Sequence, residues 1–229
     1  MNGNPISKMF DKIATRYDLI NDLLSFGIHR TWLREAVRKI TITSPSRILD
    51  LATGTGKFAF LLQKYFPKSQ IYGIDISQNM LALANKRNTN GNIHFLYGDA
   101  LQIPFENNDF DLVTMSYGIR NVSNIVLCLR EIYRVLRPNG EFIIVEFGRP
   151  LPWFRSLYQI YQRMIMKPLG GIISGDFRAY AYLVNTINKF PSGKEFIKIV
   201  EETNLFEDIE YYILTYGIAY IYKGKAKKN

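Results

Sequence analysis

The chain has 229 residues, which suits one large domain able to bury a core without disulfides or a structural metal. Hydrophobic residues make up 47% and charged residues 21%, values that exclude disorder over most of the chain. The 29 Lys and Arg exceed the 20 Asp and Glu by nine, and this +9 charge favours an anionic partner such as nucleic acid, a membrane surface or a phosphorylated substrate.

Short apolar runs alternate with stretches of helical periodicity between residues 47 and 147. Buried strands are predicted at residues 47–52, 70–76, 93–99, 110–116 and 141–147. Helices are predicted at residues 58–66, after Ser77 as N-cap, and from Ser123 as N-cap to Leu136. This alternation indicates an α/β fold, a Rossmann-like doubly wound parallel sheet with helices on both faces.

The C-terminal part of the chain adds one helix and two strands to this pattern. Phe190-Pro191-Ser192 opens a helix that is predicted to reach about residue 204. Strands are predicted near residues 209–214 and 218–222, and the lysine-rich tail at residues 223–229 is expected to be solvated and frayed.

Two aromatic-rich segments stand outside the alternation. Residues 1–40 precede the first strand and are predicted to form an N-terminal helical cap. Residues 150–190 lie between the fifth strand and the last helix, and we expect them to form a helical lid. Both are interpreted as additions that cover the carboxyl end of the sheet, within a single domain spanning residues 1–229.

A glycine-rich turn at residues 52–56 follows the first predicted strand. In open parallel sheets, ligands bind beyond the carboxyl ends of the strands. Gly54 and Gly56 let a ligand approach the backbone closely, and the helix behind them offers N–H donors. Asp50 is interpreted either as part of this binding site or as an acceptor for the N–H groups of the turn.

The next strands also end in polar residues. Asp75 ends the second strand, where an acid usually accepts the two hydroxyls of a ribose. Asp99 and Ala100 follow the third strand, where a carboxylate can accept the amino group of an adenine. Ser116 ends the fourth strand.

These acids favour a ligand that is cationic and contains adenosine, such as S-adenosylmethionine, over a dinucleotide with its pyrophosphate. Ala59 stands where the dinucleotide fingerprint has its third glycine, and the sequence lacks a phosphate-binding loop followed by Lys and Ser or Thr. The sequence therefore argues against a nucleoside triphosphatase.

The sequence resembles the class I S-adenosylmethionine-dependent methyltransferases. Within them it is similar to the ubiquinone/menaquinone biosynthesis C-methyltransferase family, which includes the demethylmenaquinone methyltransferases. The general resemblance rests on residues 50–56, 73–77 and 134–140. The more specific resemblance rests on residues 10–14, 17–18, 21–30 with Trp32, 116–121, 146–147, 180–183, 190–191 and 217–218.

The resemblance implies a seven-stranded sheet whose last strand is antiparallel, and methyl transfer from S-adenosylmethionine to a ring carbon of a polyprenylated quinol. Demethylmenaquinol is the first expectation for the substrate, and a polyprenyl methoxybenzoquinol of ubiquinone biosynthesis is the alternative. Cofactor contacts carry over onto Thr55, Asp75, Asp99, Ala100 and Ser116. This chain departs from the family at Lys57, where the family usually has Asp.

Attack by a ring carbon requires that the adjacent hydroxyl lose its proton, so the site needs a base or a group that stabilises the phenolate. Arg120 is a fixed cation suited to that task, and Asn121 could orient it. Tyr17 and His29 of the N-terminal segment are further candidates. We therefore predict these four residues as the catalytic group, with no metal.

The segment at residues 151–168 combines aromatic and aliphatic residues with Arg155, Arg163 and Lys167. This composition is typical of a helix lying on an anionic membrane, and it equally suits a helix packed on the domain. A polyprenyl substrate tail would reside in the bilayer, so an apolar lid with a basic rim agrees with the implied function.

The remaining expectations concern compartment and partners. The polar start of the chain, the single cysteine (Cys128) and the absence of a long apolar run predict a cytoplasmic protein, with peripheral association at the inner face of the membrane left open. A methyltransferase acting on another lipid-like small molecule and a basic nucleic-acid-binding module are the rival functions. Nucleic acid is not expected, because the basic residues are scattered. A homo-oligomer or an assembly with other quinone-biosynthesis enzymes is left open.

Overall fold

The computed structural model describes residues 11, 14–15, 22, 27–89, 91, 93–162, 164 and 177–228, without the side chains of residues 177–181 and 183. Seven strands in this part of the chain form one sheet in the order β3-β2-β1-β4-β5-β7-β6. The strands are β1 (Arg47–Leu51), β2 (Gln70–Asp75), β3 (Ile93–Tyr97), β4 (Phe110–Ser116), β5 (Leu136–Phe147), β6 (Phe206–Leu214) and β7 (Ala219–Ala226). β7 pairs antiparallel with β5 and β6, and the other pairs are parallel, so the predicted fold class is confirmed.

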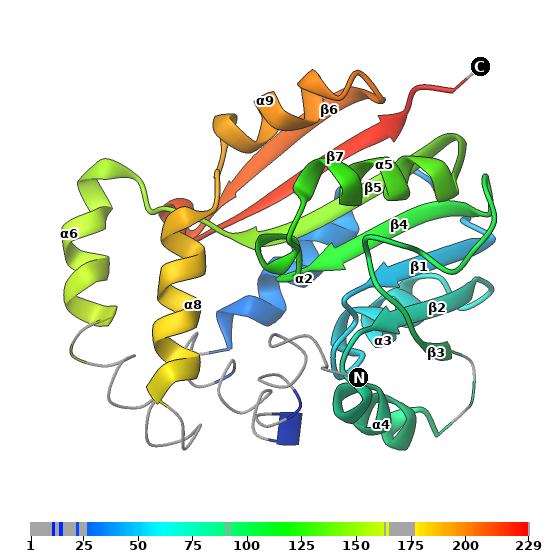
Figure 1. Cartoon of the computed structure of the whole chain (residues 1–229), viewed down its shortest axis with the longest axis horizontal. Helices are drawn as coiled ribbons and strands as arrows, with labels where there is room; N and C mark the ends of the chain where they lie inside the picture. The colour runs from blue at the N-terminus through cyan, green and yellow to red at the C-terminus, as the bar shows by residue number, and fades with distance from the viewer. Residues whose placement is uncertain are drawn as a thin grey trace.

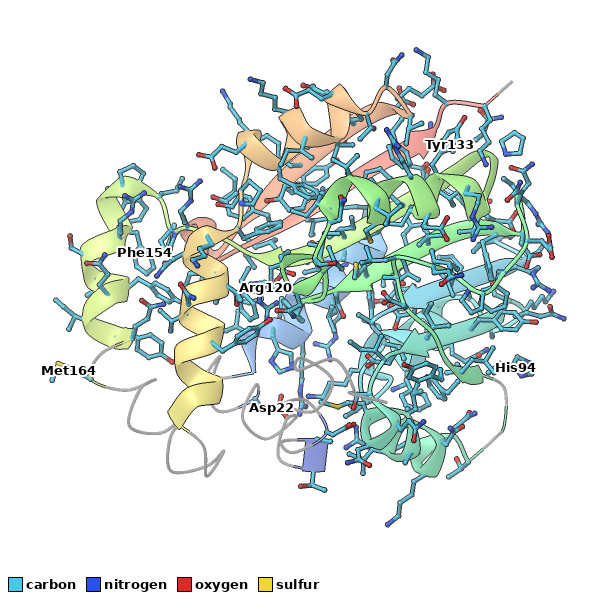
Figure 2. All side chains as sticks on the ribbon, in the orientation of Figure 1. Asp22, His94, Arg120, Tyr133, Phe154 and Met164 are labelled. Atoms are coloured by element: carbon cyan, nitrogen blue, oxygen red, sulfur yellow. The ribbon has the colours of Figure 1, made fainter. Side chains whose placement is uncertain are left out.

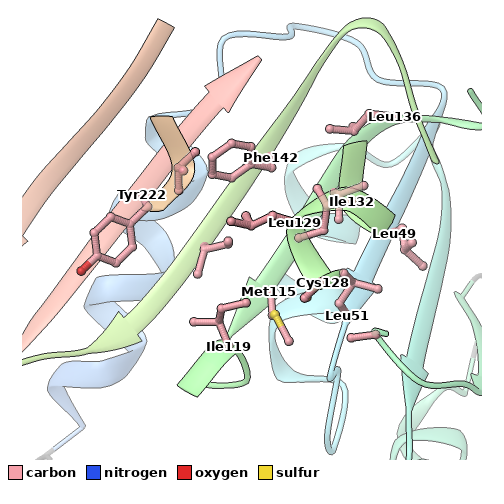
Figure 3. Packing of buried hydrophobic residues seen from close by; sticks show 14 of the residues in the cluster. Leu49, Leu51, Met115, Ile119, Cys128, Leu129, Ile132, Leu136, Phe142 and Tyr222 are labelled. Atoms are coloured by element: carbon pink, nitrogen blue, oxygen red, sulfur yellow. The ribbon is translucent and has the colours of Figure 1, made fainter. Parts of the chain in front are cut away.

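Helices α5 (Ile125–Val135) and α9 (Lys194–Glu202) cover one face of the sheet (Figure 1). Leu49 and Leu51 of β1 point to this face, because alternate side chains of a strand project to the same side. Figure 3 shows them packed against Cys128 and Leu129 of α5. Cys128 is fully buried, as predicted, and burial raises the pKa of its thiol to about 12.

The opposite face is covered by α2 (Ile28–Arg38), α3 (Lys57–Tyr65) and α4 (Gln78–Arg87). Trp32 of α2 packs here beside Ile143 of β5, and its Nε1 donates to Thr215 Oγ1 at 2.8 Å. Residues 28–38 therefore lie on a face of the sheet, which corrects the expectation that the whole N-terminal segment covers the carboxyl end. The amphipathic pattern of α2 explains the position, because its apolar stripe needs a sheet face to bury it.

Two helices extend the molecule beyond the carboxyl ends of the parallel strands (Figure 1). They are α6 (Pro152–Tyr161) and α8 (Phe177–Lys189), and both belong to the predicted lid segment. Two short 3₁₀ turns, η1 (Ile119–Asn121) and η3 (Thr215–Gly217), lie at the same end of the sheet.

The helix caps agree with the sequence in one case and differ in another. Ser77 caps α4 as predicted, because its Oγ accepts the N–H of Met80 at 3.2 Å. The cap of α5 is Asn124 and not Ser123, since Asn124 Oδ1 accepts the N–H of Leu127 at 3.0 Å. Both residue types cap helices well, so local sequence could not choose between neighbours.

The C-terminal end is not frayed through residue 228, contrary to the prediction. β7 continues through Ala226, and Lys223 is buried in it. Lys225 Nζ pairs with Asp208 at 2.9 Å, and Lys228 Nζ donates to Asn108 Oδ1 at 2.6 Å. Strand pairing and distant acceptors therefore hold lysines that composition alone assigned to solvent. The last helix likewise starts at Lys194, four residues after the predicted Phe190.

Candidate functional site

A pocket of about 220 Å³ opens at the carboxyl ends of β1, β2, β3 and β4. Its lining comes from the ends of β2 and β4, from the segments that follow the four strands, and from α4: Ala52, Gly54, Asp75, Ile76, Met80, Gly98, Asp99, Ala100, Leu101, Met115, Ser116, Tyr117, Gly118, Asn121, Val122 and Ser123. Five of the predicted cofactor residues (Gly54, Asp75, Asp99, Ala100 and Ser116) and one predicted catalytic residue, Asn121, are among them. The topology thus brings together residues that are far apart in the sequence.

Asp75 is held rigidly at the wall of this pocket. Its Oδ2 accepts the N–H of Gly54 and its Oδ1 accepts the N–H of Ser77, both at 2.8 Å. Burial raises the pKa of this carboxyl, while the backbone N–H groups of Ser77 and Gly54 oppose the rise. Each oxygen keeps acceptor capacity beyond its backbone bond, so Asp75 can still accept hydroxyl donors from a ligand.

Backbone conformation shapes the mouth of the pocket at two strand ends. Ala52 after β1 and Tyr117 after β4 both have positive φ angles, 49° and 57°, which non-glycine residues rarely adopt. Gly118 follows Tyr117, and a Cβ there would lie 2.7 Å from Ala52 Cβ. The two central strand ends therefore approach so closely that only glycine fits, and unfavourable backbone conformations gather where a ligand would bind.

The chemical character of the pocket is mixed. Asp99 is exposed, and its Oδ1 accepts the N–H of Leu101 at 2.9 Å, which fixes the loop after β3. Ile76, Met80 and Leu101 supply apolar wall. Two carboxylates beside an apolar wall complement a ligand that has a flat apolar ring, hydroxyl donors and positive charge.

Asp50, Thr55 and Gly56 do not belong to the pocket lining. Asp50 is fully buried, and its carboxylate accepts the hydroxyls of Thr53 at 2.6 Å and Thr114 at 2.8 Å. It therefore ties the turn to β4 beneath the pocket, which supports the structural alternative for this residue. Thr55 is also buried, and Gly56 is closely approached by the ring of Phe95.

Burial raises the pKa of Asp50 to about 7, despite the two hydroxyl donors. In the unfolded chain this carboxyl ionises near its ordinary pKa of 3.8, so between that pH and a pH of about 7 the unfolded state holds fewer protons than the folded state. Stability contributed by Asp50 is therefore fully present at low pH and is lost as the pH rises to about 7.

We expect Asp50→Asn to remove this loss, because an amide does not titrate. From about pH 5 to about pH 8, the free energy of unfolding of the native chain should fall by about 3 kcal/mol relative to Asp50→Asn. Urea unfolding at several pH values measures the difference. Asp111→Asn is the matched control, because the pKa of Asp111 is lowered and this residue stays ionised throughout the range. Parallel pH profiles for the native chain and Asp50→Asn would contradict the assignment.

Arg120 is the middle residue of η1 and is not among the residues that line the pocket. Its Nη1 donates to Glu146 Oε1 and to the carbonyl of Tyr117, both at 2.6 Å, and its backbone N–H donates to Glu146 Oε2 at 3.2 Å. Both side chains of this ion pair are buried, with 4% of Arg120 and none of Glu146 exposed. Burial raises the pKa of Glu146, and the guanidinium opposes the rise. The pair therefore fixes η1 and presents its last residue, Asn121, to the pocket.

Asn121 joins this loop to the lid segment. Its Oδ1 accepts the hydroxyl of Tyr182 on α8 at 3.2 Å. The side chain of Tyr182 is half-buried, and burial raises the pKa of its phenol. A polar pair from η1 and α8 thus borders the pocket on the side of the lid.

His29 and Lys57 meet around Asp22, which Figure 2 places at the same end of the sheet. Asp22 accepts from Arg30 Nε at 2.9 Å, and its carboxylate lies 3.4 Å from His29 Nε2 and 3.6 Å from Lys57 Nζ. The hydrogen bond from Arg30 and the charge of Lys57 lower the pKa of Asp22. Lys57 is the first residue of α3, where a cation opposes the helix dipole, so Asp22 offsets an unfavourable position.

A second acid of the N-terminal segment holds another helix start. Asp11 Oδ1 accepts from Ser77 Oγ at 2.5 Å and from the N–H of Asn79 at 3.2 Å. Negative charge is favourable at a helix N-terminus, and Asp11 adds to the repulsion that raises the pKa of Asp75. Asp11 therefore lies beside the start of α4, and Asp22 lies beside the start of α3. Tyr17, the remaining catalytic candidate, lies outside the described residues.

Sequence reasoning missed several lining residues, notably Ile76, Met80, Tyr117 and Ser123. Ile76 directly follows Asp75, so the position after a strand-end acid was the available signal for it, whereas Met80 lies five positions after Asp75, in the first turn of α4. Tyr117 precedes Gly118 in a strand-to-turn transition, which is another recognisable signal. Tyr182 carried no signal of its own, because its position depends on how α8 packs on η1.

Comparison with known proteins gives a match to a family model over residues 1–226, the ubiE/COQ5 methyltransferase family. A demethylmenaquinone methyltransferase of Thermus thermophilus is 41% identical over 219 residues, covering 94% of this chain and 99% of that protein. A mitochondrial 2-methoxy-6-polyprenyl-1,4-benzoquinol methylase of Dictyostelium discoideum is 37% identical, covering 96% of this chain and 80% of that protein.

Solved structures share the fold. A SAM-dependent methyltransferase of Thermotoga maritima matches with a TM-score of 0.70 at 20% identity, covering 96% of this chain and 99% of that one. A phosphoethanolamine N-methyltransferase of Haemonchus contortus, solved with S-adenosyl-L-methionine, matches with a TM-score of 0.64 at 17% identity, covering 86% of this chain and 53% of that one. At these identities the likeness concerns the architecture of the chain.

Proposed function

Because this chain belongs to the ubiE/COQ5 methyltransferase family, we propose that it transfers the methyl group of S-adenosylmethionine to a ring carbon of a polyprenylated quinol. The family membership confirms the resemblance drawn from the sequence motifs. Demethylmenaquinol is the proposed substrate and menaquinol the product, in line with the name of the Thermus relative. The benzoquinol of ubiquinone biosynthesis is the alternative, because the Dictyostelium relative is named for it.

The observation that carries the cofactor proposal is Asp75 on the wall of the pocket. Its fixed carboxylate suits the two hydroxyls of a ribose, and Asp99 with Ala100 suits the amino edge of an adenine. Ile76 and Met80 offer apolar wall for the adenine ring. S-adenosylmethionine, once bound, supplies an electrophilic methyl group on a sulfonium, whose positive charge the acids of the pocket complement.

On the substrate side, Asn121 and Tyr182 are the groups we assign to the quinol. Their mutual hydrogen bond at 3.2 Å places an amide and a phenol side by side next to the pocket. Such donors can orient the ring hydroxyl whose deprotonation activates the neighbouring carbon. The remaining condition is an aligned approach of carbon to methyl, which a fixed η1 favours.

We assign Arg120 a role other than the direct contact with the substrate phenolate that its charge suggested. Its guanidinium is engaged by Glu146 and by the carbonyl of Tyr117, and little of it is exposed. We therefore assign Arg120 to positioning: it holds η1 so that Asn121 faces the substrate. The charge of Glu146 offsets much of the electrostatic help that Arg120 alone would give a phenolate. His29, engaged with Asp22, and Tyr17 remain predictions.

The proposal is tested by incubating the protein with methyl-labelled S-adenosylmethionine and lipid extracts from cells that lack the final ring-methylation step. Two extracts are compared, one containing demethylmenaquinol and the other the methoxybenzoquinol. We expect the label in menaquinol, and label in the benzoquinol product would select the alternative. Label in neither extract, with transfer to another lipid or to RNA, would overturn the quinol assignment. An extract that already carries the methyl group is the control.

A further inference from the structure

Helix α6 presents an apolar face to solvent at its outer side. Trp153, Leu157 and Ile160 of α6 and Met164, three residues beyond its end, are 67%, 61%, 55% and 72% exposed. Their spacing of four, three and four residues places them on one side of a helix. Figure 2 shows Met164 at the outer margin of the molecule, below α6. Large apolar side chains gathered in this way mark an interaction surface, whereas scattered ones do not.

The inner side of α6 already packs against aromatic residues of the protein. Its apolar outer side therefore does not belong to the hydrophobic core. Tyr158 is buried, and the ring of Phe154 stacks on it at 6.4 Å and contacts Tyr216 of η3 at 5.1 Å. Trp153 also packs on Tyr216, with ring centroids 4.9 Å apart. Tyr216 is itself half exposed and extends the surface. We call the five residues Trp153, Leu157, Ile160, Met164 and Tyr216 the α6 face.

The stretch of sequence that contains α6 is basic. Between Glu146 and Asp176 it contains Arg149, Arg155, Arg163 and Lys167 and no acidic residue, and Arg149 is paired with Glu195 of α9. Arg155 lies on α6 and is exposed. An apolar face with basic residues and with Trp and Tyr among its members matches the boundary of a bilayer that carries anionic headgroups. A second copy of this chain fits less well, because a two-fold interface would bring the same basic residues together.

We propose that the α6 face docks the protein on the surface of a membrane containing anionic lipids. Within the part of the chain that the structure describes, no helix is both long and apolar enough to cross a bilayer. α6 lies beyond the carboxyl ends of the parallel strands, the same end of the sheet as the pocket (Figure 1). Docking through α6 brings the pocket end toward the lipid. The advantage of this placement for a prenylated substrate rests on the proposed function, whereas the docking itself does not.

The test is flotation of the full chain with vesicles of phosphatidylcholine alone and of an equal mixture of phosphatidylcholine and phosphatidylglycerol. We expect binding to the mixed vesicles that weakens with added salt. Trp153→Glu with Leu157→Glu should lower the partition coefficient by more than about tenfold, because two exposed apolar anchors are replaced by charges that anionic lipid repels. Tyr65→Glu is the matched control: this tyrosine is comparably exposed, lies at the end of α3, and should leave binding unchanged.

Circular dichroism first establishes that the variants are folded. Failure of the native chain to float at low salt, or equal flotation of the double variant, would overturn the proposal. A self-association without vesicles that the double variant abolishes would also overturn it, in favour of a second copy. Methylation of a quinol that lacks the prenyl tail is measured in parallel. If the native chain does not float but still methylates this quinol, only the docking proposal is overturned. If the native chain floats but methylates no quinol, only the proposed function is overturned.

Discussion

Asp75→Asn is expected to lower the affinity for S-adenosylmethionine by about a hundredfold or more. The carboxylate is proposed to accept both ribose hydroxyls, and a hydrogen bond to a charged group contributes about 1.5 kcal/mol or more, so two amount to about 3 kcal/mol. The variant also turns an amide NH₂ toward the N–H of either Gly54 or Ser77, both of which Asp75 now accepts at 2.8 Å. Isothermal titration calorimetry with the cofactor measures the loss.

Asp109→Asn provides the matched control for this experiment. Asp109 pairs with Arg47 at 2.8 Å, at the amino end of β1, and it is absent from the pocket lining. The same chemical change there should leave the dissociation constant unaltered. If Asp75→Asn bound the cofactor within about threefold of the native affinity while remaining folded, Asp75 would not be the ribose acceptor. A dinucleotide that bound more tightly than S-adenosylmethionine would overturn the cofactor assignment.

Glu146→Ala is expected to destabilise the fold by about 3–5 kcal/mol, because it leaves the guanidinium of Arg120 buried without its counter-charge. In a domain of this size the melting temperature should fall by roughly 10 °C. Differential scanning calorimetry measures the change. Arg134→Ala is a useful comparison, since its ion pair with Glu131 is partly solvated and its loss should cost less.

A double variant separates stability from turnover at the same pair. Arg120→Met with Glu146→Gln removes both charges and keeps one carbonyl oxygen, which can accept the N–H of either Arg120 or Phe147, whereas Glu146 now accepts both on separate oxygens. We expect it to recover part of the stability lost in Glu146→Ala, to bind the cofactor normally, and to methylate the quinol far more slowly. Arg120→Ala alone should also keep cofactor binding and lose turnover. Full activity in the double variant would remove Arg120 from the mechanism.

The architecture followed from local signals in the sequence. Short apolar runs separated by helical periodicity predicted β1 to β5, and Ser77 was identified as the cap of α4. Asp75 could be placed at the pocket in advance, because the residue that ends a buried parallel strand must lie at the carboxyl edge of the sheet. Periodicity, capping and strand ends depend on neighbours within a few residues, and such neighbours can be read directly from the amino-acid sequence.

The sequence by itself therefore determined the α/β class, the strand-end position of the pocket and the family. Only the tertiary structure decided which polar residues face that pocket. The sequence offered both Asp50 and Arg120 as candidates for the site, yet Asp50 is bonded to Thr114 and Arg120 to Glu146, at separations of 64 and 26 residues. Lys57 likewise pairs with Asp22, which lies 35 positions earlier, and no local sequence pattern indicates this contact. Exposure and pairing arise from segments that meet only after folding, and for that reason they cannot be predicted from the spacing of residues along the chain.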